Sequence, residues 1–399
     1  MIVTIEAPAN NGECVTHVDG KVIFVSKAIW GERVEIEIVR EKKKFAWAKT
    51  VRLLDPSPLR RPHIWAEGEA KGIGGCELGH VTVDGQSQWK TQVIANQMRK
   101  IGGRVLAEQF HKIGSDVREL GEDPRTRTRV EFEVHASGQP AMYRAGTKEL
   151  VPIESMPLAA PAFTDLEVFS ERWQTLWVPG DRLRAIMPVG EPRLLIDSVA
   201  YSAQGERAKP SVIYEVDTGT KKLPFEVSAT GFWQPHRDGA SALYQTVMKS
   251  ARGEKILELF SGAGLFSVGL SKIGQLTTIE GSESAVRDAK NNLQKLGAQN
   301  VQAFSGKISA RTLAEFSSKD GFDLIVLDPP RAGAGIPLIR QISALSPARI
   351  IYIACDIAAL ARDGKELLTH GYELSGHTAL DLFPNTYHVE QVAVFDKAK

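Results

Sequence analysis

The sequence has few cysteines and no long apolar run. Three cysteines in 399 residues are too few and odd in number for a disulfide framework, which fits a reducing compartment. No apolar run approaches the roughly 20 residues that a membrane-spanning helix needs. The segment after Met1 also lacks the charged and apolar regions of a signal peptide. We therefore expect a cytoplasmic protein with no membrane partner.

A large excess of charge of one sign is also absent. Lys and Arg number 49 and Asp and Glu 48, which gives a formal net charge of +1. Any contact with nucleic acid must therefore depend on local basic patches and not on a global field. Repeats of solenoid period and low-complexity tracts are absent as well.

The chain is long enough for two or three domains, since 399 residues exceed what one hydrophobic core usually organises. Short β-rich runs alternate with turn signals up to Leu54 and predict a small β-barrel over residues 1–56. The linker Asp55-Pro-Ser-Pro58 ends this pattern, because two prolines remove backbone donors. The runs are 2–5, 21–25, 33–39 and 45–51.

The rest of the chain divides into two regions. Residues 57–225 are irregular, with a helical stretch near 86–101 and an alternating run at 129–134, and predict a mixed α+β domain. From residue 226, and clearly from Glu254, strands, glycine turns and helices repeat. Apolar runs of strand length predict an α/β, doubly wound, Rossmann-like domain over 226–399. They are 256–260, 276–279, 322–327 and 349–354.

A glycine loop follows the first of these apolar runs. Gly262 and Gly264 lie between a strand and a helical run, where a missing Cβ lets the backbone approach a ligand. Ser267 stands where a nicotinamide-binding fingerprint would have its third glycine, which disfavours a dinucleotide. Glu280 ends the next strand, where a carboxylate can accept both ribose hydroxyls. A cofactor site is the favoured interpretation, and a glycine turn with a capping acid is the alternative.

A cysteine ends the last parallel strand. Cys355 precedes a helix that we expect to begin near Ile357 and to include Arg362. A helix N-terminus and nearby cations lower a thiol pKa, so we expect Cys355 to be a nucleophile. Cys14 and Cys76 are interpreted as small buried apolar groups.

Four segments in this order resemble the motifs of the RNA 5-methyluridine methyltransferases, and the N-terminal barrel resembles the TRAM module that many of them carry. The resemblance implies that Cys355 is the nucleophile and Glu390 the general base. It also makes Gln234, Phe260, Glu280 and Asp328 contacts of S-adenosylmethionine, together with Gly262 and Gly264. The segments are 258–264, 327–333, 354–363 and 381–390.

The sequence departs from this family at several positions. Leu265 replaces a residue that is often polar, and Asp356-Ile357 replaces a usual Asn-Pro. Many TRAM-bearing relatives hold an iron-sulfur cluster through four cysteines. Here Cys76 alone is present, and the other places hold Glu67, Ile73 and Met156. We therefore expect no metal and no iron-sulfur cluster.

The expected partner is RNA, with ribosomal RNA favoured over tRNA, and the protein is expected to be a monomer. Lys42, Lys43 and Lys44 precede interleaved aromatic residues and would bind RNA; a solvated charged hairpin is the alternative. Arg331, after Asp328-Pro-Pro, would bind a phosphate or carboxylate. Two other functions stay open: a cytosine or amino-group nucleic-acid methyltransferase, and a non-catalytic RNA-binding relic.

Overall fold

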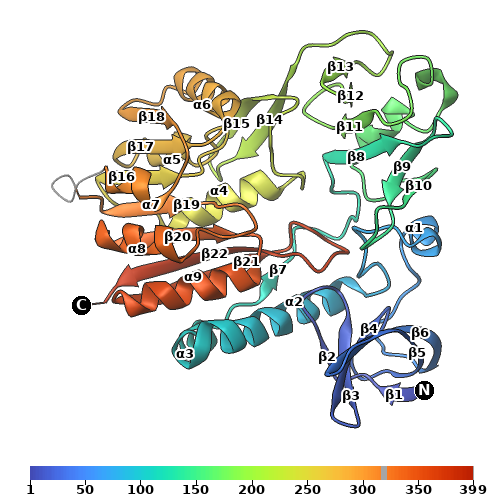
Figure 1. Cartoon of the computed structure of the whole chain (residues 1–399). Helices are drawn as coiled ribbons and strands as arrows, with labels where there is room; N and C mark the ends of the chain where they lie inside the picture. The colour runs from blue at the N-terminus through green and yellow to red at the C-terminus, as the bar shows by residue number, and fades with distance from the viewer. Residues whose placement is uncertain (316–320, 399) are drawn as a thin grey trace.

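The computed structural model describes residues 1–315 and 321–398 and folds them into three units (Figure 1). The N-terminal unit is a curved six-stranded sheet with the strand order β1-β5-β6-β4-β3-β2. Along β4 and β6 buried and half-exposed residues alternate, because successive side chains of a strand point to opposite faces. The predicted small β-unit is confirmed. Its strands are β1 (Ile2–Thr4), β2 (Ala7–Pro8), β3 (Cys14–Val18), β4 (Lys21–Ser26), β5 (Arg33–Glu41) and β6 (Phe45–Asp55).

The central unit has a second six-stranded sheet, in the order β10-β9-β8-β11-β12-β13. One face of this sheet packs on aromatic residues that include Phe163 and Trp173. The run predicted at 129–134 is strand β8. The elements are α1 (Ala66–Lys71), β8 (Arg129–Val134), β9 (Pro140–Tyr143), β10 (Leu150–Pro152), η2 (Pro161–Leu166), η3 (Glu171–Trp173), β11 (Arg182–Ile186), β12 (Arg193–Ile196) and β13 (Val199–Tyr201).

The C-terminal unit contains an eight-stranded sheet in the order β18-β17-β16-β19-β20-β22-β21-β7. The strands from β18 to β20 are parallel, and β22 runs antiparallel to both of its neighbours. The predicted doubly wound fold is confirmed. Its elements are β16 (Lys255–Leu259), α5 (Ser267–Leu270), β17 (Gln275–Glu280), α6 (Glu283–Lys295), β18 (Val301–Ser305), α7 (Ala310–Ala314), β19 (Leu324–Leu327), α8 (Ile336–Ala344), β20 (Arg349–Ala354), α9 (Ile357–Thr369), β21 (Tyr372–Leu380) and β22 (Glu390–Lys397).

Several earlier elements pack on this C-terminal sheet. The predicted helix near 86–101 is found as α2, which continues through η1 into α3, and buried residues of α2 and α3 share one core with α9. The hairpin β14–β15 is joined to α6 by Asn292, which bonds the backbone of Glu226 in both directions. The domain boundaries at 56 and 225 stay a prediction. These elements are α2 (Val83–Gln97), η1 (Met98–Gly102), α3 (Gly103–Ile113), β7 (Val117–Arg118), β14 (Ser211–Asp217), β15 (Lys222–Ser228) and α4 (Gly239–Ser250).

A buried ion pair fixes the N-terminal unit at the predicted linker. The Glu32 side chain is fully buried and accepts hydrogen bonds from Arg60 Nε at 2.6 Å and Nη2 at 2.7 Å. Glu32 also accepts from the amides of Ile29 and Ser57. Because these donors satisfy the carboxylate, its burial does not leave an unpaired charge.

Within the two described ranges, the model contains no helix that is both long enough and apolar enough to span a membrane.

Candidate active site

The predicted site residues meet where parallel strands end. In the ladder, Leu259 of β16 pairs with Leu327 of β19, and Leu327 pairs with Tyr352 of β20. The loops that follow these strands therefore leave the same edge of the sheet. The strand order changes direction at β16, and ligands of open α/β sheets bind at such a point.

The antiparallel strand β22 brings Glu390 to the same edge. Ala354, the last residue of β20, pairs with Gln391 of β22. One step further along this register, Cys355 stands opposite Glu390, although the two residues are 35 positions apart in the sequence. Directly opposed residues have Cβ atoms about 5 Å apart. Cys355 is half-buried and Glu390 is 3% exposed.

Burial disfavours the charged forms of the carboxyl groups here. It raises the pKa of Glu390 well above its usual value, and the nearby Asp328 carboxylate raises it further. Burial, followed by the charge of Glu280, raises the pKa of Asp328 to about 7. The ionisation of Asp328 and that of Glu390 depend on each other. A proton that stays bound at neutral pH is therefore shared by the two carboxyl groups and is not assigned to one of them.

The expectation of a lowered thiol pKa at Cys355 is wrong. Burial raises this pKa to about 12, and the charges of Glu390 and Asp328 add to the effect, while Arg331 opposes it. The N-terminus of α9 is capped by Asp356, whose Oδ1 accepts from the Ala359 amide at 2.7 Å. Arg362 donates instead to the Ala332 carbonyl and to Asp363.

The glycine loop forms an open cradle beside these groups. Glu280 Oε2 accepts from the Gly262 amide at 3.0 Å, and Oε1 accepts from the Ser282 amide at 2.7 Å. Gly262 has a φ of +54°, and a Cβ at this position would meet no atom within 4 Å. Phe260 has a φ of +62°, a strained value for an aromatic residue that is typical of ligand-binding sites. Since a carboxylate oxygen has two lone pairs, Glu280 retains acceptors for the hydroxyls of a nucleoside.

Asp328 and Glu258 carry two further carboxyl groups near the glycine loop, and Glu258 was not identified from the sequence. Asp328 follows β19, as predicted. Glu258, in β16, is 1% exposed, and burial raises its pKa to about 8. Its Oε2 accepts from the Ser267 hydroxyl at 2.5 Å, and its Oε1 has no hydrogen-bond partner among the described residues.

The loop after β15 carries Gln234, which is 7% exposed. Phe232, two residues earlier, is 74% exposed and was missed in the sequence analysis. The signal that could have identified Phe232 is its place two residues before Gln234 in a glycine-containing loop.

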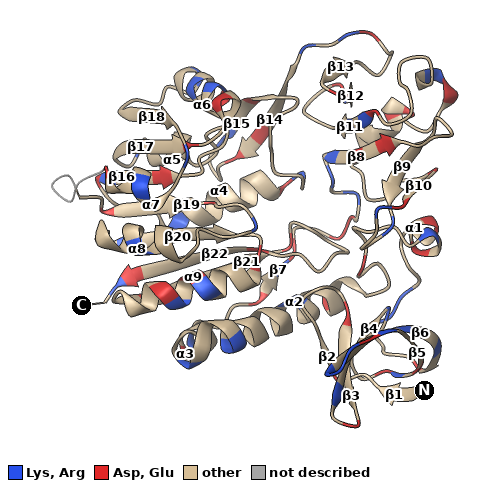
Figure 2. Cartoon of the chain, in the orientation of Figure 1, with Lys and Arg blue, Asp and Glu red and all other residues tan. Residues whose placement is uncertain are grey.

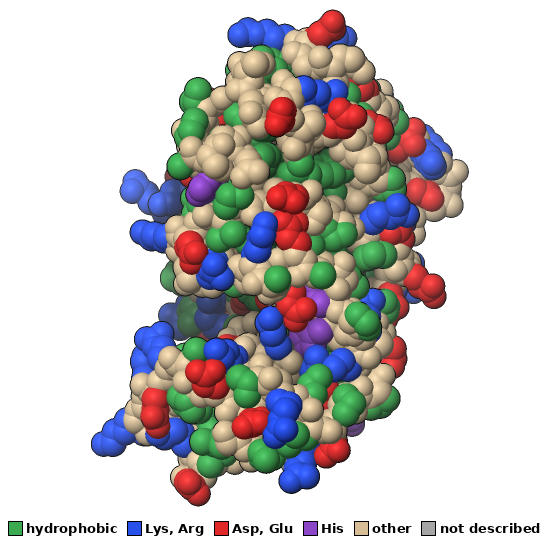
Figure 3. Space-filling view, turned by 90° about the vertical axis from the view of Figure 1, so that its right-hand side faces the viewer, with side chains coloured by type: hydrophobic (Ala, Val, Ile, Leu, Met, Phe, Trp, Pro, Cys, Tyr) green, Lys and Arg blue, Asp and Glu red, His purple; other side chains and the backbone are tan. Residues whose placement is uncertain are grey.

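The predicted RNA-binding residues lie in two places. Arg331 is exposed beside His388, with Nη2 to Nε2 at 3.4 Å. Lys42, Lys43 and Lys44 are exposed in the turn between β5 and β6, and Figure 2 shows Lys and Arg positions in blue along this part of the backbone. The Lys42 ammonium lies 5.5 Å from the ring centre of Phe45 and 5.9 Å from that of Trp47. In Figure 3 a recess separates the lobe that contains the barrel from the rest of the molecule, with basic side chains around it.

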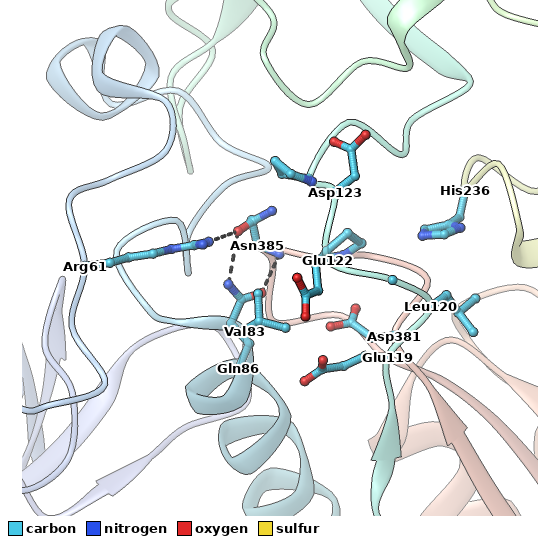
Figure 4. A pocket seen from close by; sticks show the side chains of 13 residues that line it. Arg61, Val83, Gln86, Glu119, Leu120, Glu122, Asp123, His236, Asp381 and Asn385 are labelled. Carbon is cyan, nitrogen blue, oxygen red and sulfur yellow. Dashed lines mark hydrogen bonds between the residues drawn. The ribbon is translucent and has the colours of Figure 1, made fainter.

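A buried ion pair beside the site was not predicted. Lys90 Nζ, fully buried on α2, donates to Asp381 Oδ1 at 2.7 Å. Asp381 also lines a small pocket, together with Arg61, Gln86, His236 and Asn385 (Figure 4). Arg61 and Gln86 both donate to Asn385 Oδ1, at 2.6 and 3.0 Å. These bonds hold the loop before Glu390 against α2.

Apolar packing and hydrogen bonds surround Cys76 and the residues Glu67, Ile73 and Met156. Cys76, Ile73 and Met156 lie in one core with Trp65. Glu67 Oε2 accepts from the Ser155 hydroxyl at 2.5 Å, and Lys71 donates to Oε1 at 2.8 Å. Across residues 1–315 and 321–398, no three His, Cys, Asp or Glu side chains form a group that could hold a metal ion.

Comparisons with known proteins agree with this geometry. The model of the family described as tRNA (Uracil-5-)-methyltransferase matches residues 209–398, and the TRAM domain model matches residues 1–51. The chain is 35% identical to an uncharacterized RNA methyltransferase of Bifidobacterium longum, over 99% of this chain and 96% of the relative. It is 28% identical to the 23S rRNA (uracil(1939)-C(5))-methyltransferase RlmD of Pseudomonas fluorescens, over 98% of this chain and 93% of the relative.

A solved structure shares the fold over the whole chain. It is the Pyrococcus abyssi tRNA (uracil-54, C5)-methyltransferase in complex with S-adenosyl-L-homocysteine, with a TM-score of 0.74, 21% identity and 99% of each chain covered. The fold, the two family models and the relatives over full length lead to one conclusion: the chain is a TRAM-containing member of the RNA (uracil-5-)-methyltransferase family.

Proposed function

We propose that the protein methylates carbon 5 of a uridine in ribosomal RNA through a covalent adduct with Cys355, with S-adenosylmethionine as methyl donor. The observation that supports the proposal is the register of β20 and β22: Ala354 pairs with Gln391, Cys355 and Glu390 are the next residues along the two strands, and the Glu390 charge acts on the Cys355 thiol. The proposed reaction requires a nucleophile and a general base that can both reach the same uracil.

Cys355 acts first in the proposed cycle. Carbon 5 of uracil is a poor nucleophile, and an extruded or unstacked uridine is needed for access. The thiolate of Cys355 adds to carbon 6, which makes carbon 5 enolate-like and able to take the methyl group. The raised pKa of Cys355 means that the thiol must give its proton to a base at this stage. The Asp328 carboxylate, whose charge also acts on this thiol, would accept the proton and release it to solvent, so that Glu390 is ionised for the second step.

Glu390 acts second, by removing the hydrogen from carbon 5 so that Cys355 is eliminated. A carboxylate of ordinary pKa is a weak base, and burial makes the ionised form of Glu390 a stronger one. The buried position also keeps bulk water away from the adduct.

The residues of the glycine cradle fit the proposed cofactor. S-adenosylmethionine supplies a methyl group on a positively charged sulfonium. Glu280 would accept the ribose hydroxyls, and the open space over Gly262 leaves room for the nucleoside. Asp328, Phe260, Gly264 and Gln234 are proposed as further contacts.

The β5–β6 turn of the barrel is proposed to bind RNA outside the active site. Lys42, Lys43 and Lys44 would neutralise phosphates. Trp47, which is half-exposed and stacked on Phe24 with ring centres 6.1 Å apart, would contact an unpaired base. Arg331 would hold a phosphate of the target nucleotide.

Ribosomal RNA is favoured over tRNA because two relatives of full length, from Pseudomonas fluorescens and Vibrio parahaemolyticus, are named 23S rRNA methyltransferases. A monomer in the cytoplasm is part of the same proposal.

The test is methyl transfer from labelled S-adenosylmethionine to ribosomal RNA and to tRNA that lack modifications, followed by mass analysis of the nucleosides. We expect 5-methyluridine in ribosomal RNA. Methylcytidine or a methylated amino group would identify the cytosine or amino-group alternative, and no product together with no cofactor binding would identify the non-catalytic one.

Two variants test the covalent mechanism. Cys355→Ala should abolish both methylation and any adduct, because no other thiol lies at this edge among the described residues. Glu390→Gln should methylate carbon 5 and then stall, so that a protein-RNA complex survives denaturing electrophoresis. Turnover by Cys355→Ala would refute the covalent route. Cys14→Ala is the matched control, because this buried cysteine lies in the barrel.

A further inference from the structure

We propose that Arg129 and Arg184, on the central sheet, are positioning residues that hold the loop 228–234 in its binding geometry. The inference rests on the proposed function, because this loop carries Gln234 and the exposed ring of Phe232. The central unit would then help to shape the binding site of the C-terminal unit.

The two arginines bind consecutive carbonyl groups of the loop. Arg184 Nη1 donates to the Thr230 carbonyl at 2.9 Å, and Arg129 Nη1 donates to the Gly231 carbonyl. Arg129 lies in β8 and Arg184 in the adjacent β11, where Arg184 pairs with Glu131. Both side chains therefore leave the face of the sheet opposite to its aromatic core, toward the C-terminal unit.

The contacts of the two guanidinium groups differ. Arg184 Nε donates to Glu131 Oε1 at 2.8 Å, so its charge is paired. Among the described residues, Arg129 has no carboxylate within salt-bridge distance: its Nε donates to the Tyr214 hydroxyl at 3.1 Å, and its Nη2 is buried without a hydrogen-bond partner. A buried, unpaired donor costs stability, and an apolar side chain would avoid this cost. The bond to the Gly231 carbonyl, together with the hydroxyl and the ring of Tyr214 beside the guanidinium, offsets part of this cost.

The other side of the loop is fixed by the C-terminal unit. Asp288 of α6 accepts from the Ser228 amide at 2.8 Å and from its hydroxyl at 2.9 Å. The Trp233 ring stacks on Tyr214 with ring centres 5.3 Å apart. Phe232 lies between the bound carbonyl of Gly231 and the buried Trp233, and its side chain is still 74% exposed. The loop is thus held on both sides while this ring is presented outward.

A purely structural contact between the units already exists further along the chain. The Thr128 amide donates to the Pro235 carbonyl at 2.7 Å, and the Arg237 amide donates to the Thr126 carbonyl at 2.9 Å. These backbone bonds join the units whatever side chains stand at 129 and 184. Within the loop, the arginines bind the carbonyls of residues 230 and 231, so their loss should free the loop and leave the units joined.

The test uses the full chain with Arg129→Met, Arg129→Lys and Arg184→Gln. Arg172→Met is the control, because Arg172, in the same unit, also donates to a backbone carbonyl, that of Leu166 at 2.7 Å. The first readout is hydrogen-deuterium exchange of residues 229–234, which does not depend on activity. The second is KM for S-adenosylmethionine and for RNA, with kcat, and thermal unfolding is measured alongside.

We expect faster exchange over residues 229–234 in Arg129→Met and Arg184→Gln but not in Arg172→Met. KM should rise about tenfold, the usual effect of losing one charge-assisted hydrogen bond, and the melting temperature should fall no more than in the control. Arg129→Lys keeps the positive charge but loses the planar set of guanidinium donors. Its exchange rate and KM should lie between those of Arg129→Met and the wild type.

The proposal is overturned if exchange over residues 229–234 is unchanged in folded Arg129→Met and Arg184→Gln, or if the control shifts KM equally. A wild-type protein without methyl transfer would instead refute the proposed function, and the exchange measurement would still decide whether the arginines hold the loop.

Discussion

Replacing Glu258 by glutamine should change how the stability of the protein depends on pH. Glu258 lies in the central strand β16 and is 1% exposed. Burial raises its pKa from 4.5 to about 8, and the charges of Asp328 and Glu280 contribute in the same direction. The folded protein therefore keeps the Glu258 proton at neutral pH, while the unfolded chain loses it.

The sign and size of the effect follow from linkage. Between pH 4.5 and pH 8 the unfolded state has released the proton and the folded state has not, so a rise in pH favours unfolding. The stability that this group contributes is complete below pH 4.5 and is lost as the pH rises through 8. At ~1.4 kcal/mol for each pH unit, the loss is on the order of 5 kcal/mol.

Glu258→Gln removes this titration but keeps the shape of the side chain. Relative to the wild type, the variant should gain about 3 kcal/mol of unfolding free energy between pH 5 and pH 8. Urea unfolding of both proteins at pH 5, 6.5 and 8 measures the difference. Glu226→Gln is the control: hydrogen bonding to Lys295 lowers the pKa of Glu226 to about 2, so this group is ionised throughout the range. Parallel pH profiles of the wild type and Glu258→Gln would refute the reasoning.

Three further predictions concern the site and Cys76. Glu280→Ala should weaken S-adenosylmethionine binding by about 1 to 3 kcal/mol, as hydrogen bonds to a charged group do; unchanged affinity by calorimetry would remove Glu280 from the site. Because the pKa of Cys355 is about 12, kcat/KM should still rise with pH at pH 9, and a plateau below pH 7 would contradict this. Cys76→Ser should leave methylation intact, and protein prepared without oxygen should contain no stoichiometric iron; a brown, iron-containing preparation would show that ligands complete a cluster.

The sequence predicts the positions of the reacting groups well because they depend on local pattern. Apolar runs of strand length define β16, β17, β19 and β20 with errors of one or two residues. Parallel strands release their following loops at one edge of a sheet. The meeting of the glycine loop, Asp328 and Cys355 therefore follows from the order of the elements, before any contact is known.

Contacts between distant parts of the chain could not be predicted in the same way. Lys90 is a polar residue in a helical pattern, where a solvated side chain is the common outcome, and its partner Asp381 lies 291 residues away. The sequence places Cys355 before a helix that contains Arg362, which suggested a lowered pKa. It does not show that the Asp356 side chain accepts a hydrogen bond from the Ala359 amide at the start of that helix. It also does not show that Arg362 donates to the Ala332 carbonyl.

The charges of the site favour a positively charged cofactor, in agreement with the sequence motifs. Glu258, Asp328 and Glu390 lie at one edge of the sheet, and each has a raised pKa because burial and like charges disfavour its ionised form. Within the described residues, Arg331 is the cation that acts on Cys355 in the opposite direction, and its side chain is exposed. A cationic ligand among these carboxylates would lower their pKa values and be held by them. The sulfonium of the proposed cofactor supplies this charge, so the clustered carboxyl groups favour that cofactor over a neutral nucleoside.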